Sequence, residues 1–158
     1  YGKEEGLVKE STPREPVTAS GRVLKELEDW LHQLPGTSVD ILRLAGLVGP
    51  DRHPGRFFAG KSAPDGQQGV NLVHLEDVIS AITLLLQAPK GGHIYNICAP
   101  LHPARGIFYP QMARELGLAV PVFSDSGKGK GKIIDGNLIC RELGFEYQYP
   151  DPLRMPME

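Results

Sequence analysis

The feature of this sequence that most constrains its fold is the alternation of helix-periodic segments with short apolar runs. In 20–34 and 75–88, apolar residues recur every three or four positions, which predicts amphipathic helices. The runs 38–44, 69–74 and 93–98 are short and apolar, which is typical of mostly buried strands. Helices that alternate with buried strands predict a layered α/β fold.

Local signals predict how these helices are bounded and which side chains they bury. Thr18 and Ser20 are both candidate N-caps of the first helix, and Pro35-Gly36 is expected to end it. The second helix is expected to carry its apolar positions on one face, namely Leu75, Val78, Ile79, Ile82, Leu85 and Leu86.

The remaining segments carry weaker signals. A third helix is expected at 110–116 with Pro110 in its first position, and a last helix at 138–143 with Asn137 as its cap. Short extended pieces are expected at 120–123 and 132–135. Loops are expected at 3–16, at 45–69 with one short helix at 56–59, and in the tail 147–158, which should extend over the surface.

The composition excludes several classes of protein. The chain has 158 residues, with 17 Lys and Arg against 19 Asp and Glu, and this near-neutral balance argues against a nucleic-acid-binding module. Its strongest apolar stretch, 81–86, is far shorter than the ~20 residues of a membrane span. The charged residues of 1–10 do not resemble a signal peptide. We therefore expect a cytoplasmic protein with no membrane partner.

Cysteine and histidine spacing gives no metal site. Cys98 and Cys140 lie far apart in apolar surroundings and are expected to be reduced core residues. The five histidines lack the i, i+4 pairing of a metalloprotease helix. His74 lies where a strand passes into a helix, a common place for active-site groups, although a histidine there can also be satisfied by a backbone hydrogen bond.

Two segments resemble phosphate-binding loops. Gly55–Ser62 matches the G-x-x-x-x-G-K-S pattern, but the motif needs a preceding strand and a following helix, and prolines flank it on both sides. The segment 126–132 alternates glycine and lysine without a Ser or Thr after any lysine, and it is expected to be a mobile solvated loop. A nucleotide hydrolase acting through Gly55–Ser62 remains the less favoured alternative.

An ordered set of motifs makes the chain similar to a known family. The motifs are Tyr1-Gly2, Ser20-Gly21, the acidic helix positions 26–28, and the segments 41–50, 71–78, 94–97 and 142–145. Together they resemble the C-terminal portion of the NAD-dependent epimerase/dehydratase family, the extended short-chain dehydrogenases/reductases, and within it the YeeZ-like subgroup. The chain opens at Tyr1 without an initiator Met, and we expect it to be a piece of a longer protein.

The resemblance implies a fold and a cofactor. It implies the C-terminal part of a Rossmann-type doubly wound parallel sheet in 1–50, and a substrate-binding or capping region in 51–158 that is interleaved with the last sheet strands. NAD or NADP would bind only together with an N-terminal Rossmann half, which carries the pyrophosphate site. The partners implied are that half and a nucleotide-sugar or similar small polar substrate.

The resemblance also assigns candidate site residues. It places Ser20 where the family has its catalytic Tyr and Leu24 where it has the Lys, so neither half of the usual proton-transfer pair is present. It implies nicotinamide contacts for Leu44, Ala45, Gly46 and Leu47. It implies substrate contacts for Gly49, Pro50, Arg52, Arg56 and His74, where the arginines would bind a phosphate or carboxylate.

Two functions follow from the resemblance. The first is an epimerase/dehydratase-like protein, and the alternative is a non-catalytic NAD(P)-binding sensor or scaffold, which the replacement of Tyr and Lys favours. Without the first half of the sheet, apolar surface on the first helix and first strand should stay uncovered. We therefore expect the chain alone to form a homodimer, to aggregate or to be marginally stable.

Overall fold

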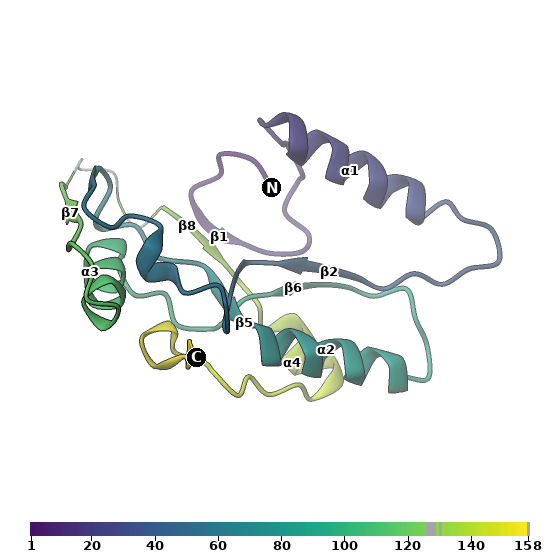
Figure 1. Ribbon diagram of the computed structural model, residues 1–158. Helices are drawn as coiled ribbons and strands as arrows, with labels where there is room; N and C mark the ends of the chain where they lie inside the picture. Colours follow the sequence, from purple (N-terminus) through teal and green to yellow (C-terminus); the bar gives the residue numbers. More distant parts are fainter. Residues whose placement is uncertain (126–128, 130, 158) are drawn as a thin grey trace.

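The computed structural model describes residues 1–125, 129 and 131–157, and it shows an alternating α/β architecture (Figure 1). The helices are α1 (Ala19–Leu31), α2 (Leu75–Gln87), α3 (Arg105–Glu115) and α4 (Leu138–Leu143), with 3-10 helices η1 (Pro54–Arg56) and η2 (Pro152–Arg154). The strands are β1 (Gly6–Val8), β2 (Ile41–Leu44), β3 (Gly46–Val48), β4 (Ser62–Ala63), β5 (Leu72–His74), β6 (Ile94–Ile97), β7 (Val122–Phe123) and β8 (Lys132–Ile134).

The described strands form parallel pairs, which confirms the predicted fold class. The pairs are β1–β8, β2–β6, β3–β5 and β4–β7. The chain runs from β2 into β3 with Ala45 between them and changes partner there, from β6 to β5. Parallel strands need crossover connections, and α2 supplies the one between β5 and β6.

Two apolar clusters hold these elements together. One is centred on α2, β5, β6 and α4 and consists of Val73, Val78, Ala81, Leu85, Tyr95, Ile97, Ile139 and Phe145. The other joins α3 to β3, β5 and the C-terminal segment and consists of Val48, Val70, Leu72, Ala99, Phe108, Met112, Met155 and Met157. The carboxyl ends of β3 and β5 therefore lie between two packed layers.

Helix α1 lies apart from this packing. Figure 1 shows α2 and α4 on one side of the β2–β6 pair and α1 on the other. Thr18 caps α1 by accepting a hydrogen bond from the Gly21 backbone, as predicted, but the helix ends at Leu31, before the predicted stop. It has no buried residue, and its apolar face is exposed at Val23, Leu24, Leu27 and Trp30. The expected uncovered apolar surface is therefore present on this helix.

Three described strands lie in segments where the sequence predicted loops. β1 lies within the predicted loop 3–16 and pairs with β8, more than a hundred residues away. β3 and β4 lie within the predicted loop 45–69 and pair with β5 and β7. These strands have only two or three residues, so their pairing partners rather than their own sequence pattern define them.

The second strand is less buried than predicted. β2 begins at Ile41 rather than at residue 38, and none of its residues is fully buried. Leu44, at its end, is 45% exposed. Among the described residues β2 pairs with β6 alone, so its other edge is open.

The apolar residues predicted to share a face of α2 are buried only in part. Asp77, Val78, Ala81 and Leu85 are the buried positions of the helix. A second apolar stripe is exposed and consists of Leu75, Ile79, Ile82 and Leu86. The described sheet covers only one side of a helix that is apolar on two sides.

The third helix differs from its predicted bounds, whereas α4 spans the predicted residues 138–143 but lacks its predicted cap. Helix α3 starts at Arg105, so Pro110 lies inside it rather than at its first position. Its first backbone N–H groups are bonded to loop carbonyls of Gln68 and Gly66, which fixes the earlier start. Asn137 precedes α4 without a side-chain cap, and its own backbone and side-chain N–H groups donate to Asp135.

The predicted surface tail is instead part of the core. Met155 and Met157 are 6% and 8% exposed, and they pack in the cluster formed with α3. Alternate residues of an extended segment point to the same side, which lets both methionines reach the core around Pro156. Residues 126–128 and 130 of the glycine-lysine segment 126–132, predicted as a mobile loop, lie outside the described residues.

Candidate functional site

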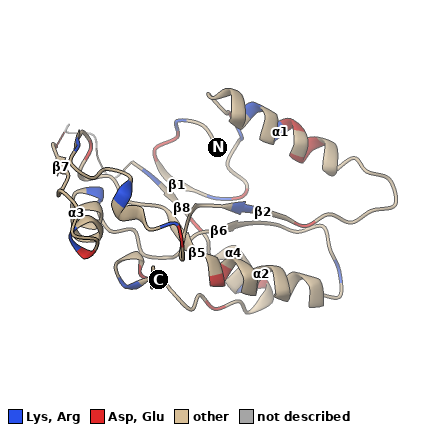
Figure 2. Cartoon of the chain, in the orientation of Figure 1, with Lys and Arg blue, Asp and Glu red and all other residues tan. Residues whose placement is uncertain are grey.

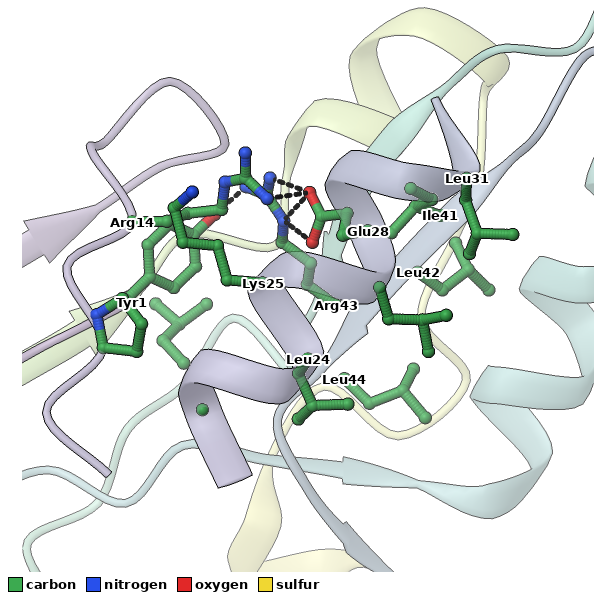
Figure 3. Close-up of a pocket in the computed structure, with 14 residues that line it drawn as sticks. Tyr1, Arg14, Leu24, Lys25, Glu28, Leu31, Ile41, Leu42, Arg43 and Leu44 are labelled. Carbon is green, nitrogen blue, oxygen red and sulfur yellow. Dashed lines mark hydrogen bonds and ion pairs between the residues drawn. The ribbon is translucent and has the colours of Figure 1, made fainter. Parts of the chain in front are cut away.

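The first candidate site is a groove of about 540 Å³ between α1 and the strands β2 and β8. Figure 3 shows its ionic side chains gathered at one end and leucines at the other. Its apolar lining consists of Pro16, Leu24, Leu27, Leu31, Ile41, Leu42, Leu44 and Ile134. Its polar lining consists of Tyr1, Arg14, Lys25, Glu28 and Arg43. The larger part of the lining is therefore apolar.

The ionic end of the groove is centred on Glu28. Arg43 donates from Nε to both carboxylate oxygens of Glu28 at 3.2 Å and makes a further bond from Nη2. Arg14 Nη1 lies 3.2 Å from Glu28 Oε1, without an aligned hydrogen bond. Glu28 and Arg43 are 13% and 14% exposed. This pair fixes α1 to β2 across an otherwise loosely packed groove.

Tyr1 extends this network into the sheet. Its hydroxyl donates to Asn96 Oδ1 at 2.7 Å and accepts from Arg43 Nη1 at 2.8 Å. Burial raises the pKa of Tyr1 despite the neighbouring Arg43. Burial alone would lower the pKa of Arg43, but its bonds to Glu28 and Tyr1 outweigh burial and raise it. Tyr1 therefore stays protonated and serves as a hydrogen-bond bridge near neutral pH.

The structure places the predicted catalytic positions on the exposed side of α1. Ser20 is exposed in the first turn, and its hydroxyl lies 3.4 Å from that of Thr18. Leu24 is 65% exposed and lines the groove. The nearby amine of Lys25 is paired with Asp29 at 2.7 Å. Neither Ser20 nor Leu24 offers a group that titrates near neutral pH.

The predicted cofactor segment 44–47 is where the chain changes from β2 to β3. The backbone N–H groups of Ala45 and Gly46 donate to Ile97 and Asn71. A Cβ atom at Gly46 would lie 2.8 Å from the Leu72 side chain and 3.2 Å from the Asn71 carbonyl oxygen, so a larger residue here would force these neighbours to shift. Leu44 therefore presents an exposed apolar side chain from a rigid backbone.

A second candidate site, which we call the tail cavity, has a volume of about 680 Å³. It lies where β3 and β5 end, and it is lined by Pro50, Asp51, His53, Arg56, Glu115, Leu116, Met155, Pro156 and Met157. Two of the predicted substrate residues, Pro50 and Arg56, line this cavity. Arg52 does not line it, and its Nε instead donates to the Leu47 carbonyl at 2.7 Å.

His74 and Gly49 lie behind the tail cavity. His74 is 1% exposed; its Nδ1 accepts from the Glu76 backbone and caps α2, and its Nε2 lies 2.8 Å from the Pro156 carbonyl oxygen. Because Nδ1 accepts, Nε2 carries the proton and donates. A Cβ at Gly49 would lie 3.5 Å from His74 Nε2. In this structure His74 therefore joins the start of α2 to the C-terminal segment, through one backbone contact to each.

Neither a metal centre nor a membrane helix is found in the described part of the chain. No group of three or more His, Cys, Asp and Glu side chains is placed to hold a metal ion there. None of the described helices is long and apolar enough to cross a bilayer. Burial raises the pKa of the Cys98 thiol to about 12, which agrees with the prediction of an inert core residue. Figure 2 shows charges of both signs spread along the described chain.

Comparison with known proteins gives two relatives. No family model matches the chain. Protein YeeZ of Escherichia coli K12 is 80% identical over 159 aligned residues, which cover 100% of this chain and 58% of YeeZ. An epimerase family protein of Arabidopsis thaliana is 30% identical over 65% of this chain and 34% of its own length. The chain matches the C-terminal portion of YeeZ, and its relatives include epimerase family proteins.

Solved structures show the same fold. A functionally unknown conserved protein from Silicibacter pomeroyi superposes with a TM-score of 0.83 at 27% identity, over 97% of this chain and 59% of that one. UDP-glucuronic acid 4-epimerase from Bacillus cereus, in complex with NAD, gives 0.77 at 19% identity, over 99% and 56%. The chain thus spans less than two thirds of these members of the epimerase/dehydratase fold.

Sequence analysis missed the residues that organise both sites. Glu28 and Arg43 are 15 positions apart, and they are joined by Arg14 from the predicted loop 3–16 and by Tyr1 from the start of the chain. Their opposite charges were the one available signal, but charge alone does not predict which residues pair over such separations. The tail methionines were missed because the proline content of 147–158 indicated a surface segment.

Proposed function

We propose that this chain is the C-terminal part of an NAD(P)-binding, epimerase/dehydratase-like protein that acts on a nucleotide-sugar or similar small polar substrate. The Bacillus cereus neighbour is a UDP-glucuronic acid epimerase in complex with NAD, which supports this class of cofactor and substrate. Within the proposal, 1–50 completes the dinucleotide-binding domain. Residues 51–158 bind or cap the substrate.

The observation that carries the proposal is the set of open faces around β2. The strand has a free edge among the described residues, and Leu44 is exposed beside it. The apolar face of α1 lies on one side of β2, and the stripe Leu75, Ile79, Ile82 and Leu86 of α2 lies on the other. A further parallel strand with helices on both faces would cover all three surfaces. An N-terminal Rossmann half has this form.

The residues of this chain fit only part of a dinucleotide site. A pyrophosphate cradle of the G-x-G-x-x-G kind is absent from the sequence, so it would have to come from the N-terminal half. The segment Leu44–Leu47 would border the nicotinamide, because Leu44 offers apolar surface from a backbone fixed on both sides. The bound NAD or NADP would supply hydride transfer, and this segment would orient its ring.

A non-catalytic sensor or scaffold is the second candidate function. It is favoured by the exposed Ser20 hydroxyl, by Leu24, and by the pairing of Lys25 with Asp29, which together leave no acid–base pair on this part of α1. A P-loop hydrolase is disfavoured, because Ser62 begins a strand where that motif needs a helix, and a 3-10 helix precedes it.

Two assays of the whole protein distinguish the candidates: conversion of nucleotide-sugars and oxidation of NADH or NADPH. We expect epimerisation, which consumes no cofactor, or NAD(P)H oxidation with at least one member of a nucleotide-sugar panel if the protein is catalytic, and cofactor binding without either reaction if it is a sensor. The double variant S20Y/L24K restores the family pair and should raise any residual turnover. The matched variant S20F/L24M fills the same space without titratable groups and should not. Robust turnover by the unaltered protein would exclude the sensor.

A further inference from the structure

The last described residues of the chain, 155–157, form one wall of the tail cavity, and we call them the methionine strap. The side chains of Met155 and Met157 are 6% and 8% exposed and pack in the apolar cluster beside α3. Among the described residues, a single hydrogen bond reaches the backbone of the strap, from His74 Nε2 to the Pro156 carbonyl oxygen at 2.8 Å. The strap is therefore held mainly by the apolar packing of two methionines.

A small molecule can approach these two methionines through the tail cavity. Both of them line it, together with exposed residues of its other walls, namely Pro50, Asp51, Arg56 and Glu115. The cavity of about 680 Å³ has room for many waters, and hydrogen peroxide is only slightly larger than water. Met112, the third methionine of the sequence, packs in the same cluster but is 1% exposed and does not line the cavity. A small oxidant therefore reaches Met155 and Met157 more readily than Met112.

Oxidation of the strap methionines would place a polar group where the packing needs an apolar one. A methionine sulfoxide carries a polar S–O group in place of the apolar thioether. The buried members of the cluster are all apolar, so they offer no side-chain donor to the new oxygen. Burying an unpaired polar group is unfavourable, and the one bond from His74 to Pro156 would be left to hold the strap.

We infer that Met155 and Met157 form an oxidation site for hydroperoxides, and that their conversion to sulfoxides releases the strap from the tail cavity. In each step the thioether sulfur attacks the terminal oxygen of the hydroperoxide, so the O–O bond breaks and an S–O bond forms. The sulfur loses two electrons, and the proton of the transferred hydroxyl passes to the leaving oxygen, which gives water or an alcohol. The inference does not depend on the proposed cofactor or substrate.

Peptide mass spectrometry after treatment of the folded whole protein with hydrogen peroxide tests which methionines are oxidised. A protease that cleaves after glutamate places Met155 and Met157 in the peptide 147–158 and Met112 in a different peptide. We expect the strap methionines to oxidise at least about 10-fold faster than Met112. In urea all three should oxidise at similar rates, because the fold no longer shields Met112.

Trypsin cleavage after Arg154 measures release of the strap. The Arg154 side chain is 88% exposed, but cleavage requires the local backbone to open, which the packed strap opposes. Peroxide treatment should speed this cleavage at least about 10-fold, and a methionine sulfoxide reductase should restore the slow rate. Met155→Gln should speed cleavage without peroxide, because it buries an amide in place of the thioether.

Two leucine variants show whether the strap methionines cause the response. In the double variant M155L/M157L, which keeps apolar side chains but has no sulfur in the strap, peroxide should leave the cleavage rate unchanged. Met112→Leu is the matched control and should respond to peroxide as the unaltered protein does. Each variant is compared with its own untreated sample, so any loosening by the substitution itself is subtracted.

Two results would overturn the inference. One is that Met112 oxidises as fast as Met155 and Met157 in the folded protein. The other is that both strap methionines are oxidised while cleavage after Arg154 is no faster than before.

Discussion

Replacing Glu28 with Gln should strongly destabilise the contact between α1 and β2. The Arg43 guanidinium makes three of its hydrogen bonds to Glu28, and only 14% of its side chain is exposed. Glutamine keeps the shape but leaves Arg43 and Arg14 facing each other without a negative charge. Breaking a buried pair in this way costs about 3–5 kcal/mol.

The lower end of that range applies here. Arg43 keeps its bonds to the Tyr1 hydroxyl at 2.8 Å and to the Glu10 carbonyl at 3.0 Å, so its charge is not wholly unsatisfied. We therefore expect Glu28→Gln to lower the free energy of unfolding by about 3 kcal/mol. With a urea m-value of about 2 kcal/mol/M, the midpoint of urea unfolding of the whole protein should fall by about 1.5 M.

Two further variants show whether the buried charge is the cause. Asp29→Asn removes a more exposed carboxylate one position along α1, 36% exposed against 13% for Glu28, and should lower the midpoint less. The double variant E28Q/R43M removes both charges and should recover part of the loss, because no unpaired charge remains. If Glu28→Gln is no worse than Asp29→Asn, or if the double variant is the least stable of the three, the reasoning is refuted.

Three further predictions concern the rest of the chain. Burial raises the pKa of Asp77, so the unfolding free energy should fall as pH rises from the ordinary aspartate pKa through the raised one. Asp77→Asn should remove this pH dependence. In urea unfolding at pH 7 it should also cost about 1–2 kcal/mol, because one of the two backbone N–H groups bonded to Asp77 is left unpaired. Burial alone would raise the pKa of Asp40, but hydrogen bonds from His93 outweigh burial and lower this pKa. The ionised carboxylate therefore stabilises the fold above the ordinary aspartate pKa, and this stabilisation is lost as pH falls through the lowered pKa. Asp40→Asn should be less stable at pH 7 and should lose less stability on acidification below about pH 4. Leu27→Lys combined with Ile79→Lys should reduce self-association of this chain alone in analytical ultracentrifugation, and it should destabilise the whole protein. Unchanged association would show that the exposed apolar faces of α1 and α2 are not responsible.

Sequence patterns predicted the elements whose signals are local. The caps and apolar periodicity located α1 and α2 to within a few residues, and the strands β5 and β6 were predicted within longer runs. β1 and β3 were missed because three-residue strands depend on partners distant in sequence. The two-sided apolar character of α2 was present in the sequence, but which side is buried depends on the sheet it packs against.

The candidate site was predictable only where its residues lie in one local sequence motif. The sequence motif 41–50 located the strand ends and the loop that carries Pro50 and Arg56, and both line the tail cavity. The opposite wall comes from Met155–Met157, about a hundred residues further along, and no local pattern indicates that contact. The role of His74 depended on Pro156 in the same way.

The proposed function requires that this chain complete a dinucleotide-binding protein whose other half covers α1, the open edge of β2 and the outer stripe of α2. Fluorescence titration of NADH and NADPH into the whole protein measures this, with this chain alone as the comparison. We predict saturable binding of at least one cofactor to the whole protein and none to the chain alone. Absence of saturable binding of both cofactors to the folded whole protein would contradict the claim.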